Sequence, residues 1–168
     1  MKMNSKGFTL IETVITTSLS TMILICMMSI LMASITGWSR GITQNTSTET
    51  ATSAAQRFCN DIRDGKSASV SGGTLTVLFP TKITDSTTGE SMYDLSSTYT
   101  MPRSYLVVNT NLVRRVGQTD TILARHIDSV TFSVQGPSVN TTLRSTDQSG
   151  RYASTGVVNS RVLLRNYR

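Results

Sequence analysis

FTLIETVITTSLSTMILICMMSILMASIT, residues 8–36, is the stretch that decides the fold of this chain. It contains one charged residue, Glu12, in a protein of 168 residues with 16 basic and 10 acidic side chains. A membrane-spanning helix needs about 20 predominantly apolar residues. No apolar run after Thr36 approaches that length. The sequence therefore predicts one span over residues 8–36, and it excludes both a plain soluble domain and a polytopic membrane protein.

The residues before this stretch, 1–7, form a short polar leader that carries Lys2 and Lys6. Because positive flanks stay on the cytoplasmic face, we expect a single-pass protein of the inner (cytoplasmic) membrane whose C-terminal part is extracytoplasmic. The apolar stretch is about twice as long as the core of a secretory signal peptide, which has roughly 7–15 residues. An uncleaved signal anchor fits it better, and cleavage near Ala33 and Ser34 stays open as an alternative.

Glu12 is an ionisable residue near the start of the hydrophobic run. A charged side chain inside the bilayer costs about 2.5–3.5 kcal/mol on insertion scales unless it is paired, so such a residue marks a functional site by default. The run contains no Lys or Arg that could pair with it. A cationic partner must therefore come from another molecule or from a newly made amino terminus.

The segment Lys6–Glu12, KGFTLIE, resembles the processing and methylation signature of type IV pilins and type II secretion pseudopilins. It combines a basic leader, Gly7 before Phe8, a glutamate four residues after Phe8, and a long apolar helix that starts at once. The resemblance implies cleavage between Gly7 and Phe8 by a prepilin peptidase and N-methylation of Phe8. It also implies that Glu12 pairs with the amino terminus of a neighbouring subunit during filament assembly.

The resemblance further implies the partners of the chain. They are other pilins or pseudopilins in a filament or tip complex, the prepilin peptidase, an inner-membrane assembly platform and membrane lipid. Segments farther along are similar, more weakly, to W-type minor pilins and J-type minor pseudopilins; these segments are Arg57–Arg63, Tyr105–Arg115, Ile122–Phe132 and Val162–Asn166. The chain departs from major pilins because its span is rich in Ser and Thr and has no proline before Pro80.

The rest of the chain predicts an α+β, pilin-like fold in which the long N-terminal helix packs on an antiparallel β-sheet. Residues 37–65 form the amphipathic half of the helix, since their apolar side chains recur at helical spacing on one face: Ala51, Ala54, Ala55, Phe58 and Ile62. Residues 66–168 form the extracytoplasmic sheet domain. Its expected strands alternate with period two and lie in Thr74–Phe79, Tyr105–Val108, Leu112–Val116, Val130–Val134 and Val157–Leu164. We expect polar loops at residues 81–104 and 138–156, and these loops are candidate sites of partner contacts.

The sequence lacks the residue patterns typical of catalysis, metal binding, an intrachain disulfide and nucleic-acid binding. His126, the one histidine, and Asp128 come without a nucleophile motif, so we expect neither an enzyme nor catalytic residues. One histidine and two distant cysteines supply no metal site, and no cofactor is expected. Cys26 and Cys59 are too far apart along one helix for a disulfide. Net charge is +6, but the arginines are spread along the chain and aromatics are 6%, so no nucleic-acid partner is expected.

The sequence thus predicts a minor pilin or pseudopilin, a structural subunit of a type IV pilus or a type II secretion pseudopilus. One alternative within the family is a component of a DNA-uptake (competence) pilus. An alternative from another class is a signal-anchored extracytoplasmic binding domain that never assembles.

Overall fold

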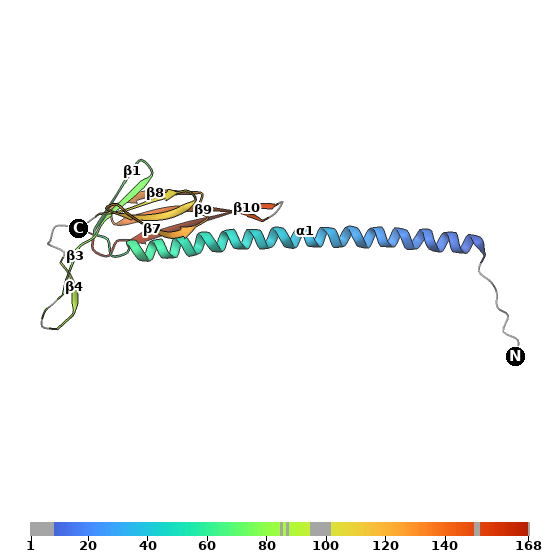
Figure 1. The fold of residues 1–168 in the computed structure, drawn as a ribbon, viewed down its shortest axis with the longest axis horizontal. Helices are drawn as coiled ribbons and strands as arrows, with labels where there is room; N and C mark the ends of the chain where they lie inside the picture. Colours follow the sequence, from blue (N-terminus) through green and yellow to red (C-terminus); the bar gives the residue numbers. More distant parts are fainter. Residues whose placement is uncertain (1–8, 85, 87, 95–101, 150–151, 168) are drawn as a thin grey trace. The chain divides into compact units, whose positions relative to one another are not determined.

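The computed structural model describes residues 9–84, 86, 88–94, 102–149 and 152–167. The chain forms two compact units, Met1–Gly41 and Ile42–Arg168. A single helix, α1 (Leu10–Ile62), begins in the first unit and ends in the second (Figure 1). This confirms the predicted continuity of the helix through the polar residues 44–50.

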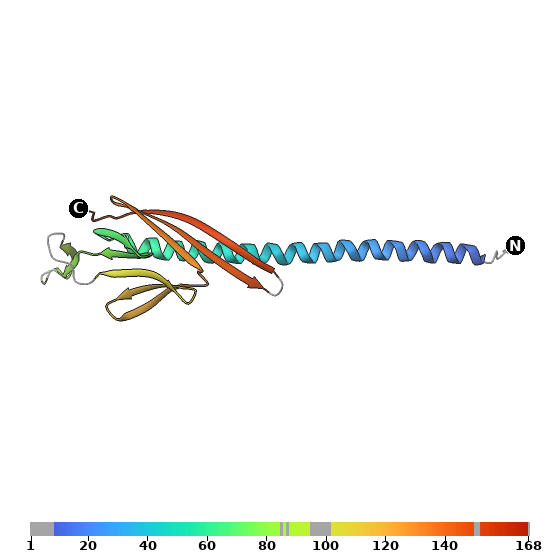
Figure 2. The same ribbon diagram turned by 90° about the horizontal axis from the view of Figure 1, so that it is seen from above.

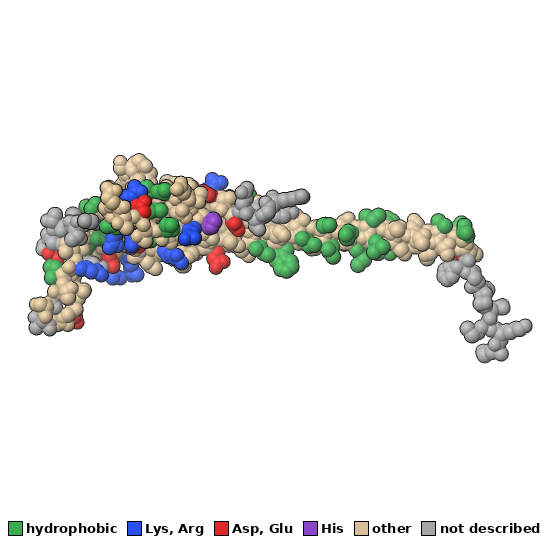
Figure 3. Space-filling model, in the orientation of Figure 1, with side chains coloured by type: hydrophobic (Ala, Val, Ile, Leu, Met, Phe, Trp, Pro, Cys, Tyr) green, Lys and Arg blue, Asp and Glu red, His purple; other side chains and the backbone are tan. Residues whose placement is uncertain are grey.

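The first unit is the apolar part of α1. Its large side chains are exposed, from Leu10 at 84% to Ile35 at 52%. Figure 3 shows these hydrophobic side chains, in green, along the first part of the helix. This part is long and apolar enough to cross a membrane by length and composition. The structure therefore contains the helix expected of a membrane anchor.

The second unit contains the strands, and every strand pair in its described residues is antiparallel. The strands form three sheets (Figures 1 and 2). The five-stranded sheet has the order β1 (Ser67–Ser71), β2 (Thr74–Leu78), β5 (Arg103–Val108), β6 (Asn111–Val116) and β7 (Thr119–Arg125). The three-stranded sheet has the order β10 (Tyr152–Leu163), β9 (Ser138–Ser149) and β8 (Ser129–Gln135), and a separate ribbon pairs β3 (Thr81–Thr84) with β4 (Ser91–Asp94). The α+β fold class is confirmed.

The core lies where the last turns of α1 meet the strands. The predicted apolar face is buried there, with Phe58 and Ile62 at 0% exposure. The Phe58 ring packs edge-on against Tyr105, with 5.3 Å between ring centroids, and lies tilted by 33° against Phe132, with 5.4 Å between centroids. Such aromatic pairs add roughly 0.5–1.5 kcal/mol each beyond the area they bury. The amphipathic half of α1 is thus held by the sheets, as its spacing predicted.

The two predicted polar loops are partly wrong. Residues 138–156 contain β9 and the start of β10, which pair without a register shift. The error has a physical cause: on β9 the buried positions alternate between apolar Val139 and Leu143 and the hydroxyls of Thr141 and Ser145. This strand therefore has a period of two that hydropathy alone does not reveal. The first loop contains the β3–β4 ribbon, and its residues 85, 87 and 95–101 lie outside the described residues.

Candidate functional site at the start of α1

The predicted processing and assembly residues lie at the start of the first unit. Gly7 and Phe8, the predicted cleavage and methylation positions, lie outside the described residues. Glu12 lies in the first turn of α1, where its carboxylate is near the partial positive charge of the helix N-terminus. Only Glu12 can therefore be assessed from the geometry.

Glu12 bonds to Thr9, three residues before it. The backbone N–H and the hydroxyl of Thr9 both donate to Glu12 Oε2, each at 3.0 Å. In return, the Glu12 N–H lies 3.4 Å from Thr9 Oγ1. This reciprocal arrangement is a capping box, in which Thr or Ser precedes Glu by three positions. The pattern Thr9-Leu10-Ile11-Glu12 is visible in the sequence, but the sequence analysis missed it.

The capping box leaves part of the Glu12 carboxylate unused. Among the described residues, Oε1 of Glu12 accepts no hydrogen bond, whereas Oε2 accepts two. An ionised carboxylate can accept about four hydrogen bonds through its two oxygens. The side chain therefore has a local role in starting α1, and it can also accept from a cationic group of another molecule.

The threonine hydroxyls that follow Glu12 in the apolar stretch are satisfied within the helix. Thr13 donates to the Leu10 carbonyl at 2.7 Å, and Thr17 to the Thr13 carbonyl at 2.8 Å. Thr21 donates to the Ser18 carbonyl at 2.8 Å. Such back-bonding removes the cost of placing a hydroxyl in hydrocarbon. The Ser and Thr content of the stretch is therefore compatible with a membrane span.

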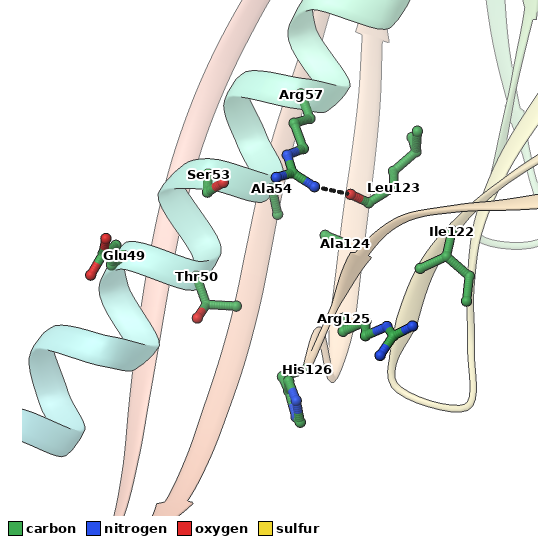
Figure 4. Close-up of a pocket in the computed structure, with 10 residues that line it drawn as sticks. All are labelled: Glu49, Thr50, Ser53, Ala54, Arg57, Ile122, Leu123, Ala124, Arg125 and His126. Atoms are coloured by element: carbon green, nitrogen blue, oxygen red, sulfur yellow. Dashed lines mark hydrogen bonds between the residues drawn. The ribbon is translucent and has the colours of Figure 1, made fainter.

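A groove of about 500 Å³ lies between α1 and β7 in the second unit (Figure 4). The pairing of β6 with β7 shifts register and leaves Leu123 without a partner on β6. The Leu123 carbonyl instead accepts from Arg57 Nη1 of α1 at 3.2 Å, the dashed line in Figure 4. A bulge and a covering side chain are two ways in which proteins protect a strand edge. The contact between Arg57 and Leu123 is therefore explained by the fold. The walls of the groove carry both an acidic side chain, Glu49, and a basic one, Arg125, so its charge favours no particular class of ligand.

His126 also lines this groove, with a positive φ of 59° that follows the end of β7. Among the described residues no hydrogen bond joins its side chain to Asp128. The Asp128 N–H donates to the Arg144 carbonyl at 2.9 Å, which fixes the start of β8.

The densest charged cluster surrounds Asp61, near the end of α1. Arg103 and Arg114 donate to Asp61 Oδ1 at 3.3 and 2.9 Å, and the Tyr105 hydroxyl donates to Oδ2 at 2.9 Å. Burial, and then the negative charge of Asp61, raise the pKa of Tyr105 far above its usual range. Sequence reasoning missed this cluster, which ties α1 to β5 and β6. Arg114 Nε in this cluster is buried and makes no hydrogen bond among the described residues. The remaining contacts join groups of this chain to one another, so we assign the cluster to the fold.

Metal-ligating side chains do not gather in the part of the chain that the structure describes, where no group of three or more His, Cys, Asp or Glu residues occurs. Cys26 is exposed and Cys59 is half-buried, and both are free thiols. No family model, no curated protein and no solved structure matches this chain.

Proposed function

We propose that this chain is a membrane-anchored structural subunit of a pilus-like or pseudopilus-like filament. In this proposal a prepilin peptidase removes residues 1–7 and methylates Phe8. The mature subunit stays in the inner membrane through the first part of α1, with residues 42–168 outside. It then joins a type IV pilus or a type II secretion pseudopilus, with other pilins or pseudopilins as its partners.

The observation that carries the proposal is the single uninterrupted helix Leu10–Ile62. Its first part is apolar and exposed, and its last part is buried under antiparallel strands. One helix can therefore serve first as a membrane anchor and later as a packing element between subunits. The KGFTLIE segment at the start of this helix adds the processing signature.

The geometry of Glu12 supports an assembly role as well. Its Oε2 is occupied by Thr9, while Oε1 has no partner among the described residues. A methylated amine at Phe8 of a neighbouring subunit is a cation that could bind this free oxygen. In a low dielectric such a pair is much stronger than it is at a protein surface, so it could set the register between subunits.

The experiment that tests the processing step is mass spectrometry of the N-terminal peptide, from cells that express the chain with its native peptidase. We expect a chain that begins at methylated Phe8. An intact leader, or a chain that begins near Ala33, would overturn this step.

A second candidate function is a signal-anchored extracytoplasmic binding domain that never assembles. The observation that favours it is the capping box, because Thr9 gives Glu12 a role within its own helix. Such a protein would keep its leader and tolerate Glu12→Leu. The peptide measurement and the Glu12 variants described below separate the two candidates.

A further inference from the structure

The β9–β10 hairpin contacts α1 in two different ways along its length. Its ladder is regular from Ser138↔Leu163 to Ser149↔Tyr152, and β8 pairs with β9 only as far as Arg144, so the half nearer the turn extends beyond β8 as a two-stranded ribbon (Figure 2). The half away from its turn meets the end of α1, and the half nearer its turn meets residues 44–48. The chemistry of the two contacts differs.

Away from the turn the contact is apolar and is reinforced by the backbone. Val139, Leu143 and Leu164 are buried in the same cluster as Phe58. Just after β10, the Arg165 N–H donates to the carbonyl of Arg63 at 2.8 Å. Burying side chains of this size contributes about 1.5–3 kcal/mol each, so this half of the ribbon is firmly held.

Nearer the turn the contact is made by polar side chains. Gln44 Nε2 donates to the Thr155 carbonyl at 3.3 Å, and Gln44 Oε1 accepts from the Ser154 hydroxyl. Ser47 Oγ lies 3.5 Å from Ser154 Oγ. Each such bond contributes about 0.5–1.5 kcal/mol net, because water replaces it when the contact opens.

The backbone of β10 touches the backbone of α1 at Gly156. A Cβ placed on Gly156 would lie 2.6 Å from the carbonyl carbon and oxygen of Ser47 and from the Thr48 nitrogen. Backbone atoms cannot move aside as a flexible side chain can. The polar contact therefore forms only because this position has no side chain.

One buried hydroxyl in this half has no partner. Ser145, opposite Gly156 on β9, is 1% exposed, and its Oγ makes no hydrogen bond among the described residues. Leaving a buried hydroxyl unpaired is unfavourable, and opening the contact would return it to water. Closure of this half thus carries a penalty at Ser145; the half away from the turn carries a similar one at Thr141, but there the aliphatic contacts offset it.

We propose that residues 154–156 of β10, which pair with residues 145–147 of β9, form a clasp on residues 44–48 of α1, and that this clasp opens while the apolar core stays closed. The freed helix segment has low helix propensity, since Thr43, Thr46, Thr48 and Thr50 are β-branched. The clasp follows from these contacts alone and does not depend on filament assembly.

Hydrogen–deuterium exchange of the full chain in detergent micelles tests the clasp. We expect the amides of residues 43–51 to exchange at least tenfold faster than those of residues 54–62, because opening of the clasp lets the first group unwind locally, whereas the second group must also leave the apolar core. Equal exchange rates would mean that the hairpin and helix open as one unit, and would overturn the proposal.

Substitutions at the contact link the faster exchange to the clasp. Gly156→Ala should speed exchange of residues 43–51 at least fivefold and leave residues 54–62 protected. Ser145→Ala should slow exchange of residues 43–51 severalfold. Thr141→Val is the matched control. The Thr141 hydroxyl is also buried and has no hydrogen-bond partner among the described residues, but Thr141 pairs with Ser160 in the half of the hairpin away from the turn. This control should leave the exchange of residues 43–51 unchanged, and an equal response to all three variants would contradict the clasp.

A reversible lock gives a second, independent measurement. Ser47→Cys with Ser154→Cys, in a chain whose Cys26 and Cys59 are replaced by alanine, can form a disulfide across the clasp. The oxidised chain should exchange at residues 43–51 as slowly as at residues 54–62, and reduction should restore the difference. Unchanged exchange in the oxidised chain would show that these amides open by another route.

Discussion

At the residue scale, Glu12 has two possible partners that differ in kind. Thr9 binds one of its oxygens within the same helix turn, and the proposed neighbouring amine would bind the other. The first interaction starts a helix, whereas the second joins two subunits. Both interactions use Glu12, but only the first uses Thr9. A substitution of Thr9 therefore affects the helix start alone, whereas a substitution of Glu12 affects both interactions.

We therefore predict that Glu12→Ala leaves membrane insertion and cleavage intact but strongly reduces incorporation into filaments. Thr9→Val removes a hydroxyl but keeps the Thr9 N–H, so it should affect incorporation much less. Immunoblots of membrane and sheared-filament fractions measure both. If Glu12→Ala assembled normally, or if Thr9→Val failed as severely, the pairing role of Glu12 would be wrong.

Tyr105 gives the stability of the second unit a dependence on alkaline pH. Its raised pKa keeps the phenol protonated in the folded chain, whereas the unfolded chain ionises near the ordinary value of 10.0. The unfolded state thus loses a proton first, so the free energy of unfolding should fall as pH rises above this value. Urea unfolding at about pH 9 and about pH 11 should show this fall. Tyr105→Phe should reduce the fall, while Tyr167→Phe, at a side chain 45% exposed, should not.

At the element scale, the end of α1 must come very close to β2 and to the end of the chain. A Cβ on Gly65 would lie 2.6 Å from Val77 Cγ1, 3.0 Å from the Ile62 carbonyl oxygen and 3.2 Å from Leu164 Cδ2. Gly65 is required for packing, because the end of α1, β2 and the residue after β10 meet at this position.

Gly65→Ala should accordingly destabilise the second unit by about 1–3 kcal/mol, the usual cost of overpacking a core. Chemical unfolding of the full chain in micelles, followed through the core aromatic rings, measures the change. Gly37→Ala is the control, since nothing lies within 4 Å of a Cβ there. A neutral Gly65→Ala would show that Val77 can move aside without loss.

At the scale of the whole molecule, the chain divides into an apolar helical unit and a unit with its own core. All the buried core residues, from Ala51 to Leu164, belong to Ile42–Arg168. The first unit contributes exposed apolar surface instead. The first unit thus has the exposed apolar surface of a helix that could cross a membrane, whereas the second unit buries its apolar side chains in its own core.

We predict that residues 42–168 alone fold into a soluble monomer, because the apolar core and the Asp61 cluster are complete within them. Size-exclusion chromatography and a cooperative thermal transition measure this. The full chain should stay with membranes after an alkaline carbonate wash. Aggregation of residues 42–168, or a non-cooperative transition, would mean that the first part of α1 also stabilises the core.

The sequence by itself determined the single apolar span, the continuous helix, its buried face and the α+β class. These properties follow from composition and periodicity, which are local. The Thr9–Glu12 capping box is equally local, but the sequence analysis missed it. Only the tertiary structure decided the Asp61 cluster and the polar contact of α1 with β10, because the partners in each lie far apart in the chain. Asp61 and Arg114 are 53 residues apart, and Gln44 and Ser154 are 110 residues apart. Whether a serine or an arginine is buried depends on which strand it meets, and no local pattern contains that information.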